Sequence, residues 1–98
     1  MRFLMFKDEY HPQVKKDLRK LDHSVVADIK TVHLSKILEN PLSADLLTGD
    51  LAGIYSYHFK KNKNDYRICY FVDTVSERVF FLMIGKRENF YTVIRRRL

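Results

Sequence analysis

The sequence predicts an α+β fold with the element order β-α-α-β-β-β-α, a small, mainly antiparallel sheet with a helical hairpin on one face and a short C-terminal helix. Two observations carry this prediction. Apolar residues recur at helical spacing in the first half of the chain, and apolar stretches separated by short polar turns fill the second half. A length of 98 residues with 46% hydrophobic content suits one domain, spanning 1–98, with a single core.

The N-terminal part predicts a strand followed by a helix. Residues 2–6 form a short apolar run, and residues 8–22 then change to a helical period with charged residues between the apolar ones. Pro12 lies near the helix start, where its missing N–H is tolerated. The predicted core-facing stripe of this helix comprises Tyr10, Val14, Leu18 and Leu21.

Residues 22–41 predict a second helix that forms an antiparallel hairpin with the first. Ser24 is a suitable N-cap, and Asn40-Pro41 ends the helix because the residue before a proline avoids helical geometry. The short connection places the two helices side by side. The residues predicted to face inward are Val25, Ile29, Val32 and either Ile37 or Leu38.

The second half predicts three consecutive strands and a terminal helix. Residues 53–61 alternate loosely, residues 65–73 are apolar on both faces apart from Arg67, and residues 79–85 form a third long apolar run. The middle run suits a central strand that is covered on both faces. Residues 89–98 predict a short basic helix.

Positive charge is distributed unevenly along the chain. Residues 1–50 contain eight Lys or Arg and eight Asp or Glu, whereas residues 51–98 contain ten basic and four acidic residues, which accounts for the net charge of +6. A basic second half suggests a surface that faces a polyanion. The alternative is that the basic residues only keep a small protein soluble.

The sequence predicts no metal or cofactor. Its three glycines are isolated, and one cysteine with four scattered histidines gives no ligand spacing. Cys69 lies in an apolar run and is expected to be an inert core thiol, while His33 is expected to be a packed helix residue. The lone cysteine fits a reducing compartment, and neither a signal-peptide nor a membrane-span pattern is present, so we expect a soluble cytoplasmic protein without a membrane partner.

Two arginines are candidates for a shared site on the sheet. Arg67 shares a strand face with Cys69 and Phe71. If the second and third strands are neighbours, Arg67 and Arg87 lie on the same sheet face, opposite the helices. The residues whose side Arg87 is expected to continue are Phe81, Met83 and Gly85.

The types of residue near these arginines suggest a phosphate site. Lys86 and Tyr91 lie close to the second arginine, and guanidinium groups bind phosphate oxygens in a bidentate manner. The alternative is a pair of ordinary ion pairs with the nearby acids Asp65 and Glu88.

Three segments resemble the RelE branch of the RelE/ParE toxin superfamily. They are residues 47–59 (LTGDLAGIYSYHF), 65–73 (DYRICYFVD) and 84–91 (IGKRENFY), and the likeness covers essentially the whole chain. It implies a RelE-like, microbial-RNase-type fold. It further implies a toxin of a type II toxin–antitoxin module, an mRNA interferase that cleaves mRNA in the ribosomal A site without a metal. A cognate RelB-like antitoxin would neutralise it.

The resemblance also implies site residues. Arg67 and Arg87 match arginines that hold the scissile phosphate, and Tyr91 matches a tyrosine that stacks on or orients the mRNA. The chain departs from the family where the RelE branch often has two lysines, because the matching positions carry Ser56 and His58.

That departure bears on the choice of general base. Metal-free RNA cleavage needs a base for the ribose 2′-OH, cations for the developing phosphorane charge and an acid for the leaving oxygen. An unperturbed histidine has a pKa of about 6.5 and can act as a base at neutral pH. We therefore favour His58 as the base, with Lys60 as the alternative, and Arg87 or Tyr91 as options for the acid.

Other basic residues are expected to contact ribosomal RNA through its phosphates, because a substrate on the ribosome brings that RNA close. They are Lys60, Lys61, Lys63, Lys86, Arg95 and Arg96, the last two within the run 95–97. Two other functions remain open from the sequence. One is a ParE-like inhibitor of DNA gyrase, and the other is a non-catalytic domain that binds RNA or a partner.

Overall fold

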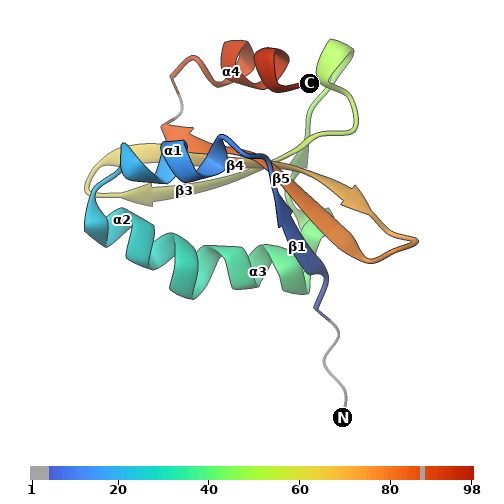
Figure 1. The fold of residues 1–98 in the computed structure, drawn as a ribbon, viewed down its shortest axis with the longest axis horizontal. Coiled ribbons are helices and arrows are strands. Elements are labelled where there is room, and N and C mark those ends of the chain that lie inside the picture. Colours follow the sequence, from blue (N-terminus) through green and yellow to red (C-terminus); the bar gives the residue numbers. More distant parts are fainter. Residues whose placement is uncertain (1–4, 87) are drawn as a thin grey trace.

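The computed structural model describes residues 5–86 and 88–98 and confirms the α+β class. Five strands form one sheet in the order β1-β5-β4-β3-β2, in which β1 runs parallel to β5 and the other pairs are antiparallel (Figure 1). The elements are β1 (Lys7–Tyr10), α1 (Val14–Arg19), α2 (His23–Asp28), the π-helical η1 (Ile29–His33), α3 (Leu34–Glu39), the 3-10 turn η2 (Pro41–Ser43), β2 (Asp45–Leu46), the 3-10 turn η3 (Gly49–Leu51), β3 (Tyr55–Lys61), β4 (Asn64–Asp73), β5 (Arg78–Lys86) and α4 (Phe90–Arg97).

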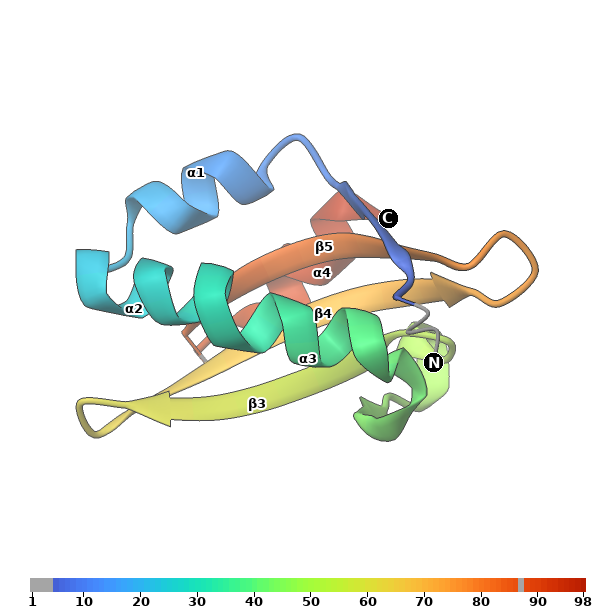
Figure 2. The ribbon, with the colours of Figure 1, turned by 90° about the horizontal axis from the view of Figure 1, so that it is seen from below.

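The helices lie on opposite faces of the sheet. α1 and the continuous α2–η1–α3 helix cover one face, and α4 covers the other (Figure 2). We call these the hairpin face and the α4 face. Each face has its own core cluster, one including Ile29 and Ile68 and the other including Cys69 and Ile94, so the central strand β4 is covered on both sides. Among the described residues, none of the helices combines the length and the hydropathy that a membrane-spanning segment needs.

The first strand and helix begin later than the sequence predicts. Residues 2–4 of the predicted strand 2–6 lie outside the described residues, and the strand that forms is Lys7–Tyr10. Tyr10 therefore belongs to β1 and not to the helix; its ring stacks on Phe81 of β5 with centroids 5.1 Å apart. The helix starts only at Val14, after Pro12, and Val14 is buried as predicted.

The second helix contains a π turn that changes which residues face the core. Val25, Ile29 and Ile37 are buried as predicted, but Val32 is 41% exposed. Val32 lies within η1, where the wider turn adds a residue to the helix and rotates the following side chains. The N-cap is Asp22 rather than the predicted Ser24.

Because of a β-bulge in β5, the residues that share a face of this strand differ from those that the sequence predicts. Cys69 pairs with Met83, but its neighbour Tyr70 pairs with Phe81, so Leu82 is the extra residue. Leu82 and Met83 both pack on the α4 face, while Phe81 packs on the hairpin face. The prediction that Phe81 and Met83 share a side was therefore wrong.

Candidate functional site

Arg67 lies at the centre of a row of residues that crosses the three long strands. Its Cα pairs with His58 on β3 and with Gly85 on β5. The neighbouring residue of β4 on the same face is Cys69, which packs in the α4-side cluster. His58 and Arg67 therefore emerge side by side on the α4 face, opposite the α2–α3 helix.

Two contacts fix the guanidinium group of Arg67. Its Nη1 donates a hydrogen bond of 3.1 Å to Oγ of Ser56, a fully buried residue of β3. The guanidinium carbon lies 4.1 Å from the centroid of the Phe90 ring of α4, in cation–π geometry. Nε is buried and has no hydrogen-bond partner among the described residues. A guanidinium group held in this way is already ordered, so its remaining N–H groups can bind an anion without a further loss of side-chain entropy.

His58 has a carboxylate beside its ring. Nε2 of His58 lies 3.4 Å from Oδ2 of Asp45 on β2, and these side chains are 44% and 80% exposed. Lys60, two residues further along β3, continues the same face, and its Nζ lies 3.9 Å from Oδ1 of Asp65. Both candidates for the general base are therefore on the same face as Arg67.

Tyr91 and Arg67 line the same hollow, which has a volume of about 450 Å³. Tyr91 is half-exposed, and its ring lies 4.0 Å from that of Phe90, which in turn covers Arg67. An aromatic side chain in this position offers a stacking surface beside the guanidinium group. The residues that line the hollow are Arg67, Asn89, Phe90, Tyr91 and Thr92.

The three arginines at the end of α4 have different environments. Arg95 lies 6.0 Å from the Tyr91 ring centroid and forms an ion pair with Asp50 at 2.9 Å. The hydrogen bond from Arg95 holds the pKa of Asp50 below its ordinary value. Arg96 is exposed, whereas Arg97 is turned inward and pairs with Asp17.

Two of the lysines that the sequence suggests as RNA contacts lie at strand positions whose side chains point toward the hairpin face. Lys61 forms a 2.9 Å ion pair with Asp28 of α2. Lys86 pairs in register with Tyr66, whose ring packs in the hairpin-side cluster. Arg87, the second predicted arginine, lies outside the described residues.

A further hollow at the end of the sheet brings two predicted lysines together. Lys63, in the tight turn between β3 and β4, and Lys86 line a space of about 390 Å³ together with Asn64 and the two acids Asp65 and Glu88. The turn has a positive φ at both Asn62 and Lys63, as a two-residue hairpin loop of type I′ requires. Lys86 thus lies at the rim of the sheet and not on the face that carries Arg67.

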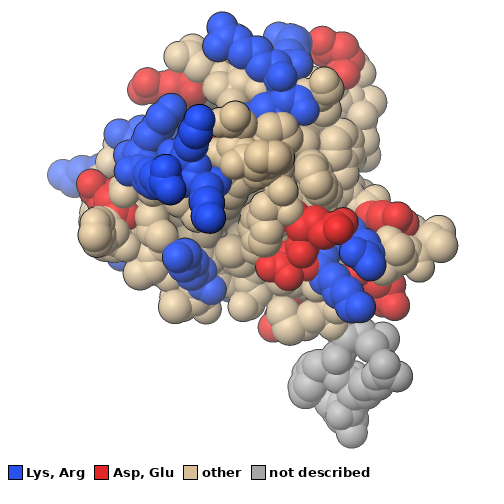
Figure 3. Space-filling model, viewed as in Figure 1, with Lys and Arg blue, Asp and Glu red and all other residues tan. Residues whose placement is uncertain are grey.

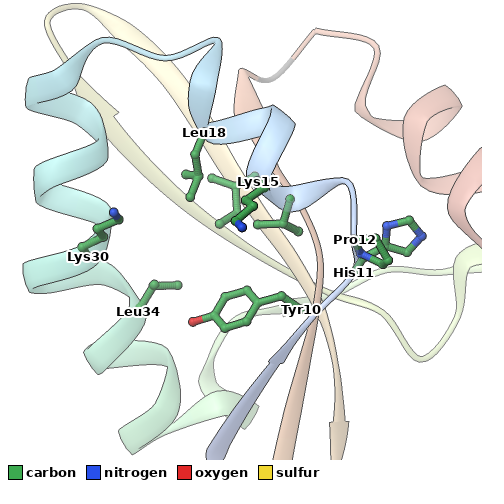
Figure 4. Close-up of a pocket in the computed structure, with 9 residues that line it drawn as sticks. Tyr10, His11, Pro12, Lys15, Leu18, Lys30 and Leu34 are labelled. Carbon is green, nitrogen blue, oxygen red and sulfur yellow. The ribbon is translucent and has the colours of Figure 1, made fainter.

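Basic residues also gather on the hairpin side, which the charge count of the first half did not indicate. Lys and Arg cluster over α1 as well as over α4 (Figure 3). Lys15 and Lys30 flank an apolar groove of about 400 Å³ between α1 and the long helix, and Tyr10 and Leu34 lie along it (Figure 4). Of the predicted site residues that the structure describes, none lines this groove.

Cys69 and His33 have the structural roles expected from the sequence. Cys69 is fully buried, and burial raises the pKa of its thiol to about 11, so it stays protonated and unreactive. The His33 ring stacks on Phe59 at 3.9 Å and its Nδ1 lies 2.7 Å from the Tyr57 hydroxyl. Within the described ranges, no group of three or more His, Cys, Asp or Glu side chains is placed to hold a metal ion.

Three neighbours of the predicted residues were missed as parts of the site. Ser56 was noted only as a departure from a pair of lysines, although strand alternation places it on the same face as His58. Phe90 precedes Tyr91, but its stacking on Arg67 depends on how α4 packs. Asp45 is 13 residues before His58 in the chain and carries no local signal of proximity.

Comparison with known proteins identifies relatives of the whole domain. A family model described as "ParE-like toxin of type II bacterial toxin-antitoxin system" matches residues 9–95. No curated protein sequence matches the chain at a significant level.

Solved structures give a consistent likeness. The free form of an Escherichia coli RelE double-arginine mutant has a TM-score of 0.76 and 26% identity, covering 96% of this chain and 98% of that one. A chain of the Mycobacterium tuberculosis RelBE2 toxin–antitoxin complex has a TM-score of 0.74 and 23% identity, with coverages of 85% and 99%. The YoeB/ParE toxin of Agrobacterium tumefaciens has a TM-score of 0.66 and 18% identity, with coverages of 83% and 98%.

Proposed function

Because the chain belongs to the family of ParE-like toxins of type II bacterial toxin–antitoxin systems and is a RelE-type member of the RelE/ParE superfamily, we propose that it is a ribosome-dependent mRNA endonuclease. It would cleave mRNA in the ribosomal A site and so inhibit translation. The observation that carries this proposal is Arg67, held against Ser56 and Phe90 beside both His58 and the hollow lined by Tyr91. A surface of this kind supplies a cation, a base and a stacking ring within one small area.

The chemistry is an internal phosphoryl transfer. His58 removes the proton from the ribose 2′-OH, and the 2′ oxygen attacks the adjacent phosphorus. The bond from phosphorus to the 5′ oxygen breaks, which leaves a cyclic phosphate and a 5′-OH once an acid has supplied a proton. Arg67 and Arg87 stabilise the charge that develops on the phosphate oxygens, because guanidinium groups bind such oxygens in pairs. Lys60 remains the alternative base.

Contacts with RNA outside the scissile bond involve the remaining basic residues. Lys60 lies on the α4 face, Lys63 and Lys86 line the hollow at the sheet rim, and Arg95 and Arg96 project from α4. These cations flank the proposed catalytic face on two sides. Their contacts with phosphate would be independent of sequence and would weaken as salt is raised.

A RelB-like antitoxin is the proposed protein partner. The Mycobacterium tuberculosis relative was solved as a toxin–antitoxin complex, and toxins of this family belong to such modules. An exposed basic surface would be covered best by an acidic or amphipathic segment, since complementary charge speeds association.

The test is cleavage of mRNA in a purified translation system, mapped by primer extension with and without ribosomes. Cuts within codons that need ribosomes and are lost in Arg67→Ala would support the proposal. Arg78→Gln is the matched control, because Arg78 lies at the opposite end of β5 in an exposed pair with Glu9. Arg87→Ala is expected to lower the rate at least about tenfold, a loss of about 1.4 kcal/mol in transition-state stabilisation.

Other outcomes would contradict the proposal. If wild-type protein leaves mRNA intact and translation unaffected, the endonuclease function is wrong. A DNA supercoiling assay with gyrase would then test the ParE-like alternative. Binding to ribosomes without any cleavage would instead favour a non-catalytic RNA-binding domain.

A further inference from the structure

We propose that Asp45 is a positioning residue for His58: its carboxylate orients the imidazole and stabilises the charge that the ring gains when it accepts a proton. This inference rests on the proposed endonuclease function and adds a residue that neither the family likeness nor the sequence pattern assigns. The observation behind it is the 3.4 Å distance between Oδ2 of Asp45 and Nε2 of His58.

The backbone places Asp45 on the correct face. Asp45 pairs in register with Ser56, and Ser56 and His58 are two residues apart on β3, so all three emerge on the α4 face. The short strand β2 is held at both of its ends. The Tyr70 hydroxyl donates to the Pro41 carbonyl at 2.7 Å before it, and the N–H of Leu47 donates to the Ile54 carbonyl at 2.8 Å after it.

A carboxylate beside one ring nitrogen determines what the other nitrogen does. With Asp45 next to Nε2, the favoured neutral tautomer carries its proton on Nε2, which leaves the lone pair of Nδ1 to accept a proton. During the reaction the proton of the ribose 2′-OH moves to Nδ1 and the ring becomes an imidazolium. The negative charge of Asp45 then stabilises that cation, as the aspartate of a Ser-His-Asp triad does for its histidine.

Other charged residues within the described part of the chain also lie near His58. Arg67 is the partner of His58 in register on β4, and Lys60 is two residues after His58 on β3. The carboxylate of Asp65 forms an ion pair with Lys60. In general a neighbouring positive charge disfavours an imidazolium, and a carboxylate beside the ring favours it. Of these described neighbours, Asp45 is the carboxylate that lies against the ring itself.

The first test measures the pair without RNA. The titration of the His58 ring protons is followed by NMR in the wild-type protein, in Asp45→Asn and in Asp22→Asn. We expect the midpoint to move to lower pH in Asp45→Asn only. Asp22→Asn removes the same charge from the start of α2, where the carboxylate makes no capping hydrogen bond. Equal midpoints in all three proteins would overturn the inference.

The second test measures the reaction under single-turnover conditions on ribosomes. Asp45→Asn is expected to slow cleavage about tenfold or more, a part of what a general base supplies, and to move the acid limb of the pH–rate profile to lower pH. Asp45→Glu, which keeps a carboxylate, should retain the wild-type limb. In a His58→Gln background, Asp45→Asn should have no further effect.

These outcomes separate the inference from the function on which it rests. An equal loss in the His58→Gln background, or faster cleavage at every pH, would show that Asp45 does not act through His58. If the wild-type protein cleaves nothing, the proposed function fails, and the NMR midpoints still decide whether Asp45 controls the ring. Because Asp45 is 80% exposed, its variants should fold normally, which thermal unfolding would verify.

Discussion

Asp17 of α1 and Arg97 of α4 form a two-pronged ion pair that joins elements eighty residues apart in the chain. The distances are 2.6 Å from Nη1 to Oδ2 and 2.7 Å from Nη2 to Oδ1, and the side chains are only 10% and 12% exposed. Asp17 also accepts the N–H of Ile84 at 3.1 Å, and Arg97 donates to the Leu82 carbonyl at 2.9 Å. This network ties both helices to the bulged part of β5.

Asp17→Asn should therefore destabilise the fold strongly. It leaves the buried guanidinium of Arg97 without a counter-ion, and removing one partner of such a pair costs about 3–5 kcal/mol. Urea unfolding followed by circular dichroism measures the change. Glu9→Gln breaks the exposed pair with Arg78 and should cost less than about 1 kcal/mol. Similar losses for both variants would show that burial adds little here.

Phe90→Leu should slow cleavage about three- to tenfold. Leucine keeps most of the apolar packing but removes the ring face that stacks on Arg67, an interaction of about 1 kcal/mol. Single-turnover rates on programmed ribosomes measure the effect. Phe71→Leu is the matched control, because Phe71 packs on the same α4-side cluster. An equal loss in both variants would attribute the effect to packing alone.

Lys60→Gln should weaken ribosome association more than Lys61→Gln does. Lys60 is exposed on the α4 face, whereas Lys61 points to the hairpin face and is paired with Asp28. Co-sedimentation with ribosomes at several salt concentrations tests this. Losing one phosphate contact should also reduce the slope of the logarithm of the binding constant against the logarithm of the salt concentration, by about one unit or less. A larger effect of Lys61 would mean that RNA also contacts the hairpin side.

Stability should fall as the pH drops below about 6.5 because of His33. Burial lowers the pKa of His33, and Lys36 adds to the lowering, so the unfolded chain takes up a proton before the folded protein does. The stabilising effect of neutral His33 is present above the unfolded pKa and is lost as the pH falls toward the folded one.

Melting temperatures at pH 7.5 and 5 in the wild-type protein and in two variants measure this dependence. His33→Gln should show a smaller loss on acidification than the wild type, because glutamine does not titrate. His23→Gln, at the exposed start of α2, should behave like the wild type. Equal losses in all three proteins would exclude His33 as the source.

Local sequence patterns predicted the elements more accurately than their ends. The long apolar runs became β4 and β5, which contribute buried residues to both faces of the sheet, and the loosely alternating stretch before them became β3. The errors lie where a tertiary contact overrides a local period. Tyr10 fits a helical stripe but pairs with β5, and Val32 fits the next stripe but lies in a π turn.

The sequence by itself determined the fold class, the helical hairpin, the three long strands and the family likeness, and it identified Arg67, His58 and Tyr91 as candidates. Period, turn residues and spacing are local properties, so they can be read from neighbours in the chain. Only the tertiary structure decided the bulge at Leu82, the stacking of Phe90 on Arg67 and the approach of Asp45 to His58. These features depend on strand register and on how α4 packs. Neither of these can be predicted from residues that are adjacent in sequence.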